Sequence, residues 1–344
     1  MSTLKVDAIR HNSATSDAIT TAADGTCTAK LTNYPHRNLF LNGAVNISQR
    51  GDSYASGYTY KADQWYIFPT GSTTTRLTTS PPDGFTYYFR FPSATNSIII
   101  SQQIELDVQG KVGKYKNKTV TVSWYARSES SNKMYVDAAF KNASGGGDYT
   151  TIVAGSGSPQ DITSSWARYS QTFTISATPH SNNKCFSVMI RTPSSGSGST
   201  GTLEATGFQC EFGDTATDFE HVAIAEDLSR CQRYYYQVGP LQTDVFGQGR
   251  TDNDNLNMVV LVHYPVTMRS APATLTTTGS AGNYDVRRDT TKGCSAVPTI
   301  HTTSSVHLAQ LICQSNSHGW GTASPMQLQA DGGGTAFLGF SAEL

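Results

Sequence analysis

Apolar and polar residues alternate along many short segments of this chain. In one of them, Val120, Val122 and Trp124 fall on one side of an extended strand, while Thr121 falls on the other. Alternation with a period of two predicts β-strands that bury one face. Further strands are expected at 97–106, 133–140, 167–175, 185–191, 201–209, 257–264, 306–313 and 335–344. Gly- and Ser-rich turns separate them, so the sequence predicts an all-β fold of antiparallel sandwiches.

One segment, residues 221–236, has a helical pattern instead. Ile224, Leu228, Cys231 and Tyr235 recur at the spacing of a heptad seam that is two repeats long. Two interpretations are open. The helix caps the sandwich that precedes it, or it forms a three-chain bundle in which these four residues are the seam. The shortness of the seam favours the first interpretation.

These elements divide the chain into four parts. Residues 1–35 carry few apolar positions and cannot enclose a core of their own, which predicts an extended N-terminal arm. Residues 36–220 form a first β domain, and residues 237–344 form a second, C-terminal β-sandwich domain. The short helix at 221–236 joins the two domains.

Composition excludes several classes of function. The net charge is −1 and the basic residues are scattered, which argues against a nucleic-acid partner. No apolar stretch approaches the ~18 residues of a membrane-spanning helix, so membrane insertion is not expected. The N-terminus lacks the apolar core of a signal peptide, which predicts synthesis and retention in a cytoplasm, or release by lysis.

Sequence motifs for catalysis are also missing. The six cysteines lack metal-ligand spacing, so buried free thiols are expected, with no metal site and no cofactor. The G-x-G-x-x-G match at 196–201 precedes a strand and not a helix, which indicates a hairpin. The polar run at 252–255 offers oxygen ligands for calcium but fails the EF-hand pattern. The sequence therefore predicts that the protein is not an enzyme.

Aromatic side chains are the best binding candidates, because a sugar ring can lie on a flat apolar surface that has a polar edge. The loop around His318 and Trp320 stands out, since the glycines beside them favour a loop tip. Core packing, or a contact between the chains of a trimer, is the alternative for each candidate. Trp65, Trp124 and Trp166 are expected in the core. The candidate glycan-binding residues are Tyr284, His318, Trp320, Tyr87 and Tyr88.

A series of short blocks in a fixed order adds a family resemblance. Together they resemble the jelly-roll module of tail-fibre and other virion-surface proteins of bacteriophages, in particular marine phages and cyanophages. The blocks are Asn38–Ala44, Ser48–Gly51, Tyr60–Trp65, Trp166–Ser170, Phe208–Gly213, Thr217–His221 and Leu228–Tyr236.

This resemblance implies a jelly-roll fold for residues 36–220 and a homotrimeric tail fibre or similar appendage on the virion surface, assembled in the host cytoplasm. Residues 1–35 would attach to other virion proteins of the tail, baseplate or an adaptor. The C-terminal domain would be a receptor-binding tip that contacts host cell-surface polysaccharide or protein. A structural calcium ion is compatible with the resemblance.

Two other functions stay open at this point. One is a capsid decoration or baseplate protein that has no receptor role. The other is a glycan-degrading depolymerase, which would need two carboxylates facing each other across a cleft.

Overall fold

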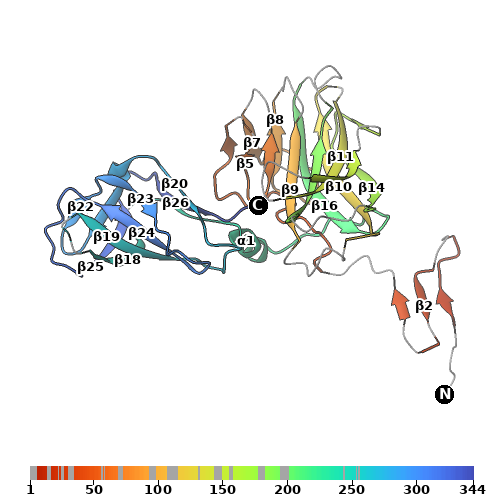
Figure 1. Cartoon of the computed structure of the whole chain (residues 1–344). Coiled ribbons are helices and arrows are strands. Elements are labelled where there is room, and N and C mark those ends of the chain that lie inside the picture. The colour runs from red at the N-terminus through yellow and green to blue at the C-terminus, as the bar shows by residue number, and fades with distance from the viewer. Residues whose placement is uncertain are drawn as a thin grey trace.

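In the computed structural model, strands make up nearly all of the regular structure (Figure 1). The structure describes residues 6–13, 17–21, 23–24, 27–29, 35–55, 57, 59–68, 73–92, 98–106, 115–130, 132–142, 149–154, 158–176, 183–193, 201–242, 245–252, 254 and 256–344. Every strand pair in this part of the chain is antiparallel, as the alternating pattern predicts.

Two sheets form the first sandwich. One has the strand order β14 (Ala167–Thr174), β10 (Thr119–Ser128), β16 (Leu203–Phe212), β8 (Tyr88–Phe91), β7 (Thr74–Leu77) and β4 (Ser53–Tyr54). The other has the order β12 (Tyr149–Ala154), β11 (Asn132–Lys141), β15 (Cys185–Arg191), β9 (Ile99–Glu105), β6 (Tyr66–Phe68) and β5 (Thr59–Tyr60), and β13 (Gln160–Ile162) also pairs with β11.

The core between these sheets follows the predicted alternation. Val120, Val122 and Trp124 are fully buried. Trp65 is also fully buried, and the centroid of its ring lies 4.6 Å from that of the Phe208 ring. Burying such large side chains is worth roughly 1.5–3 kcal/mol each, so the inward face of each strand dominates the stability of the sandwich. The prediction that Trp65 and Trp124 are core residues is confirmed.

The C-terminal part has its own pair of sheets. A large sheet has the order β22 (Thr291–Gly293), β21 (Tyr284–Arg287), β25 (Pro325–Ala330), β18 (Val245–Thr251), β19 (Asn257–His263), β24 (Leu308–Gln314) and β23 (Ala296–Ile300). A small sheet has the order β17 (Tyr235–Leu241), β26 (Ala336–Ser341) and β20 (Thr274–Thr277). One buried cluster, which includes Val260, Leu311 and Phe340, fills the space between them.

A third small sheet lies near the N-terminus. It contains β1 (Ala8–Ile9), β2 (Ile19–Thr21) and β3 (Cys27–Ala29), and it stands apart from both sandwiches (Figure 1). Ile9 is 54% exposed, so this sheet has no core on its described side chains. Strands of two or three residues are marginal without such a core.

The helix is shorter than the sequence pattern predicts. Helix α1 spans Ile224–Gln232, and Tyr235 already belongs to β17, where it pairs with Ser341 of β26. The seam therefore does not continue to Tyr235, because pairing with a strand about 100 residues further along the chain replaces the last helical turn. Cys231 and Tyr235 are buried within the chain, while Ile224 is 64% exposed and Leu228 is partly buried.

The side chain of Gln49 joins the jelly-roll sheets to the C-terminal strands. Its Nε2 donates to the carbonyl of Tyr235 at 2.6 Å, and its Oε1 accepts from the N–H of Gln237 at 3.1 Å. Asp63 fixes the same amide by accepting a second hydrogen bond from Nε2 at 2.6 Å. Gln49 thus pairs with the edge of β17 as a neighbouring strand would.

Two features are absent from the part of the chain that the structure describes. No helix there is long and apolar enough to cross a membrane. No group of three or more His, Cys, Asp or Glu side chains there is placed to hold a metal ion. The calcium candidates Asn253 and Asn255 and most of the glycine-rich motif at 196–201 lie outside the described residues.

Candidate functional site

Tyr284 does not lie on the surface. Its side chain is fully buried in the C-terminal core, and its hydroxyl donates to the carbonyl of Phe337 at 2.6 Å and accepts from the N–H of Thr278 at 3.1 Å. A tyrosine whose ring and hydroxyl are both occupied offers no face to a ligand. The candidate role of Tyr284 in glycan binding is replaced by a role in core packing.

His318 and Trp320 turn inward in the same way. His318 is 2% exposed and Trp320 is 8% exposed, and their rings stack with centroids 5.6 Å apart. His318 Nε2 lies 3.1 Å from the carbonyl oxygen of Asp254, and its Nδ1 accepts from the N–H of Trp320 at 3.1 Å. Contrary to the exposed loop tip that was expected, Trp320 belongs to the buried C-terminal cluster and the buried His318 ring stacks on it.

Asp254 belongs to the polar run at 252–255, whose oxygen atoms are the candidate calcium ligands. Hydrogen bonds from the N–H groups of Asn257 and Leu256 occupy its carboxylate and lower its pKa. The carboxylate therefore closes its own turn, as aspartates in tight turns commonly do.

Tyr87 and Tyr88 are neighbours in the chain but lie on opposite faces of their sheet. The Tyr87 ring packs against the core, with the guanidinium of Arg76 3.9 Å from its centroid. Tyr88 lies on the outer face, and its hydroxyl donates to the carbonyl of Thr79 at 2.8 Å. Of the five predicted glycan-binding residues, Tyr88 is the one in the wall of an open pocket, but its own side chain is only 2% exposed, so it supports the wall and offers little surface to a ligand.

This pocket, which we call the sheet-face pocket, lies on the outer face of the sheet that contains β8, β16 and β10. Strand register places Arg90, Glu204 and Arg127 in one row across these three strands. The pocket has a volume of about 450 Å³. Its wall consists of Leu77, Thr79, Ser80, Tyr88, Arg90, Arg127, Ser128, Glu129, Ser164, Thr202 and Glu204.

The charges in the sheet-face pocket balance. Glu204 is nearly buried and accepts from Arg127 Nε at 2.5 Å, while Arg90 Nε lies 3.8 Å from its other oxygen. Arg90 Nη2 also lies 3.9 Å from Oε1 of Glu129, whose side chain is 70% exposed. Two guanidinium groups and two carboxylates leave no net charge, and they present both donors and acceptors to whatever enters.

Trp166 stands beside this charged row. Its indole N–H donates to the carbonyl of Ser80 at 2.9 Å, and its ring meets the Tyr88 ring edge-on at 5.5 Å. The Arg127 guanidinium lies 4.8 Å from the Trp166 centroid. Trp166 is partly exposed, so the expectation that it is a core residue is corrected: its ring packs against Tyr88 and Arg127, which line the pocket.

Tyr88 stays neutral in this setting. Burial, and then the nearby Glu204 carboxylate, raise the pKa of its hydroxyl, and Arg127 opposes the shift only in part. The phenol is therefore a hydrogen-bond donor and not a base.

An aromatic cluster borders the row on the same face. The centroid of the Phe85 ring lies 5.1 Å from that of the Tyr125 ring and 4.8 Å from that of the Phe219 ring. Gly207 makes this possible, since it adopts a φ of +62° and a Cβ there would lie 2.7 Å from the Phe85 ring. Glycine is the residue that meets both demands without strain.

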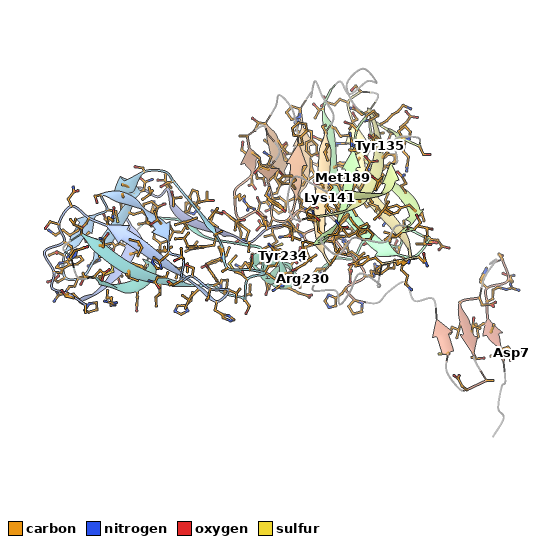
Figure 2. All side chains as sticks on the ribbon, viewed as in Figure 1. Asp7, Tyr135, Lys141, Met189, Arg230 and Tyr234 are labelled. Atoms are coloured by element: carbon orange, nitrogen blue, oxygen red, sulfur yellow. The ribbon has the colours of Figure 1, made fainter. Side chains whose placement is uncertain are left out.

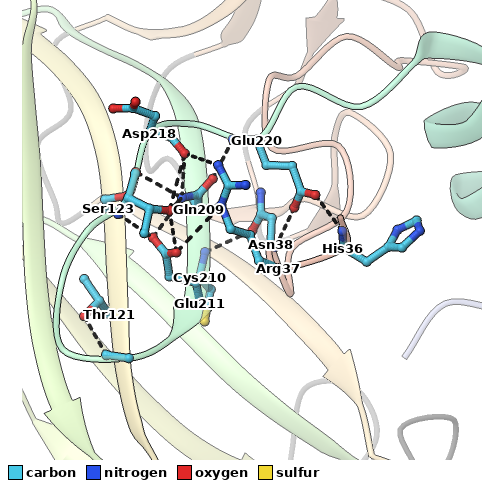
Figure 3. Close-up of polar contacts among 12 residues, drawn as sticks. His36, Arg37, Asn38, Thr121, Ser123, Gln209, Cys210, Glu211, Asp218 and Glu220 are labelled. Carbon is cyan, nitrogen blue, oxygen red and sulfur yellow. Dashed lines mark hydrogen bonds and ion pairs between the residues drawn. The ribbon is translucent and has the colours of Figure 1, made fainter. Parts of the chain in front are cut away.

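A hydrogen-bonded network covers the rest of this face (Figure 3). Arg37 Nε donates to Thr217 Oγ1 at 2.9 Å, and Thr217 in turn donates its N–H to Glu211 at 2.9 Å. The Glu220 carboxylate accepts from the N–H groups of His36 and Asn38 at 2.6 and 2.7 Å. These groups bind one another and fix residues 36–38 to the sheet, which leaves the row of arginines and Glu204 as the open part.

The sequence pattern did not single out Arg90, Arg127 or Glu204, and it placed Trp166 in the core. One signal was present: Arg127 continues the outward positions Thr121, Ser123 and Tyr125 of its strand. Its partners lie on strands far away in sequence, and only the register brings them together.

No protein-family model matches the chain, and no curated protein matches it. Solved structures give weak likenesses. The CBM22-1 xylan-binding domain from Paenibacillus barcinonensis Xyn10C is 11% identical with a TM-score of 0.33, over 52% of this chain and 96% of that one. TmCBM61 in complex with β-1,4-galactotriose is 12% identical with a TM-score of 0.33, and the match covers 52% of this chain and 99% of that one.

A third likeness is to the enzymatically active domain of tailspike protein 4 of bacteriophage CBA120. It is 13% identical with a TM-score of 0.32, over 52% of this chain and 22% of that one. Scores this low carry no argument, so the functional assignment rests on the residues of this chain.

Proposed function

We propose that this chain binds neutral glycan non-covalently in the sheet-face pocket. The observation that carries the proposal is the row of Arg90, Glu204 and Arg127 beside the Trp166 ring. A sugar ring carries hydroxyl groups that both donate and accept, and it has an apolar face. The balanced row supplies partners for the hydroxyl groups, and Leu77 in the pocket wall supplies an apolar contact. The indole packs against Arg127 and holds that side chain in the row.

Charge balance also selects against other ligands. A phosphate, sulfate or nucleic-acid backbone would approach Arg90 and Arg127 but would meet the carboxylates of Glu204 and Glu129 in the same pocket. Uncharged hydroxyl groups meet no such repulsion, so a neutral sugar is the ligand class that this pocket favours.

Binding without cleavage fits the setting of the two carboxylates. Glu204 is already the acceptor for Arg127, and Glu129 is mostly exposed on a turn. A hydrolase needs one carboxyl group that holds a proton against the glycosidic oxygen. We therefore propose a binding protein over the alternative of a depolymerase.

The direct test is to incubate the full chain with surface polysaccharides of candidate hosts. We expect co-sedimentation with polysaccharide and no increase in reducing ends over a day. An increase in reducing ends that disappears in Glu204→Gln would overturn the non-catalytic assignment. Absence of binding to any neutral glycan would overturn the function itself.

We further propose that the chain is a virion protein, a homotrimeric tail fibre or similar appendage. The resemblance of its sequence blocks to such proteins motivates the assignment. The exposed Ile9 supports it, since it lies in a small sheet without a core, which the other chains of a trimer would supply. Residues 1–35 would contact the tail, baseplate or adaptor.

Two measurements test this second proposal. Antibody labelling of intact phage particles should mark the tail region. Labelling of the capsid lattice would instead favour the decoration-protein alternative. Sedimentation at micromolar concentration should give three times the chain mass, and a stable monomer would contradict the trimer.

A further inference from the structure

A second cavity, separate from the sheet-face pocket, lies where residues 36–41 pass between β9 and α1. It has a volume of about 520 Å³, within the range of small-ligand sites. Figure 2 shows Arg230 and Tyr234, which both line it, next to each other at the base of the jelly roll. Leu39, Leu41, Ile104 and Phe212 give it apolar walls.

Gln64 lines this cavity under two unfavourable conditions. It is 4% exposed, and its amide Nε2 is buried with no hydrogen-bond partner. Its φ is +72°, because it is the third residue of a turn closed by the bond from Trp65 N–H to the Ala62 carbonyl. Glycine or asparagine is favoured at such a position. The strained backbone and the unpaired amide of Gln64 both cost folding free energy. Because Gln64 lies beside a cavity, this cost points to a role beyond the turn.

Arg230 faces the same cavity without a hydrogen bond or an ion pair to any described residue. It lies in the last turn of α1 and is partly exposed. The nearly buried carboxylate of Asp227, which attracts Arg230, already accepts from the N–H of Asn42 at 3.0 Å. Glu105 in the cavity wall accepts from the Tyr234 hydroxyl at 2.9 Å and lies 3.5 Å from Arg233. Arg230 and the amide of Gln64 are therefore donors that remain free at this cavity.

We infer that this cavity binds the carboxylate of a sugar acid, that is, a uronate unit of a polysaccharide. The carboxylate would pair with Arg230, and a neighbouring oxygen would give Gln64 the acceptor that it lacks. Glu105 would accept from a ring hydroxyl. The apolar walls would contact the carbon face of the sugar.

The charges favour a single carboxylate over an acidic peptide. Glu105 lines the cavity, and Glu226 stands at its edge, 3.4 Å from the His36 ring. A peptide with several acidic side chains would bring its second carboxylate toward one of these. A uronate carries one charge and several hydroxyl groups, so it avoids that repulsion.

The test is NMR titration of the full chain with D-glucuronate and, separately, with D-glucose. Wild type should bind glucuronate, and Arg230→Gln should weaken it by about tenfold or more, the usual effect of losing a charge-assisted hydrogen bond. Gln64→Asn keeps an amide and tolerates the turn, yet it shortens the reach, and it should also weaken binding. Arg250→Gln, which removes an equal charge from an exposed site, should have no effect.

Equal glucuronate affinity in wild type and Arg230→Gln would overturn the inference, as would tighter binding of a Glu-rich peptide than of glucuronate. Trp166→Ala should leave glucuronate binding unchanged, because Trp166 packs against Arg127 and Tyr88 of the other pocket. This variant keeps the two proposals distinguishable: loss of neutral-glycan binding alone concerns the sheet-face pocket, and loss of glucuronate binding alone concerns this cavity.

Discussion

The guanidinium of Arg50 and the carboxylate of Glu343, 293 residues apart in sequence, form a bidentate ion pair. The Nη1–Oε1 distance is 3.2 Å and the Nη2–Oε2 distance is 2.5 Å. The same guanidinium lies 3.4 Å from the centroid of the Tyr235 ring. This pair joins the jelly roll to the last residues of the C-terminal strands.

Burial sets the protonation of this pair. It raises the pKa of Glu343 to about 7, with Arg50 acting in the opposite direction. Burial would lower the pKa of Arg50, but attraction to Glu343, Tyr235 and Asp63 raises it, so the guanidinium stays charged.

We predict that the stability of the protein falls between pH 5 and pH 8. Glu343 binds its proton more tightly when folded than when unfolded. Its contribution is therefore complete below about pH 4.5 and is lost as the pH rises through about 7. The loss amounts to at most about 3 kcal/mol. Thermal unfolding at several pH values measures it. Glu343→Gln should flatten the profile, whereas Asp52→Asn, at an exposed ion pair, should not. An unchanged slope in Glu343→Gln would refute the assignment.

Removing one partner of the pair should cost more than removing both. At pH 8, Arg50→Ala leaves Glu343 buried without its counter-charge and should destabilise by about 3 kcal/mol in urea unfolding. The double variant Arg50→Met with Glu343→Leu replaces the pair by apolar groups and should recover most of that loss. A double variant that is less stable than the single one would contradict this view of the junction.

The strand positions of the first sandwich were predictable because apolar residues recur there with a period of two, although the polar residues between them, such as Thr121 and Ser123, are buried as well. Val120, Val122 and Trp124 needed no knowledge of distant residues. The end of the helix was not predictable, since Tyr235 leaves the helix to pair with Ser341. That contact depends on a strand that closes the chain, and no local pattern encodes it.

The candidate site was predictable only at Tyr88. An aromatic ring in a sequence does not reveal whether it faces a core or a pocket. Tyr284 and Trp320 proved to be core, and Trp166 proved to lie outside it. The row of Arg90 and Glu204 needs the register of strands more than 100 residues apart, which alternation cannot supply.

Gly207→Ala should destabilise the sheet that carries the pocket. The new Cβ would lie 2.7 Å from the Phe85 ring and 2.8 Å from the Tyr125 ring, at a φ of +62°. We expect a loss of about 2–4 kcal/mol from backbone strain and overpacking together. Gly51→Ala is the matched control, because its φ is +91° and no atom lies within 4 Å of the Cβ. Urea unfolding compares them, and equal losses would refute the packing argument.

Tyr284→Phe should lower stability by about 1–2 kcal/mol, since it deletes the hydroxyl that bonds to Phe337 and Thr278 and leaves buried groups unpaired. It should leave glycan binding unchanged, because the ring is buried. If this variant folds normally but does not bind glycan, Tyr284 contributes to the binding site and its assignment to the core alone is wrong.

The most direct test of the central claim is the affinity of the full chain for a neutral oligosaccharide, chosen by array and measured by calorimetry. Trp166→Ala removes the ring beside the pocket, and Arg90→Gln removes a donor that is 42% exposed. Each should weaken binding by about tenfold or more, while Tyr284→Phe binds as wild type. If Trp166→Ala and Arg90→Gln bind the oligosaccharide as tightly as wild type, the sheet-face pocket is not the glycan-binding site.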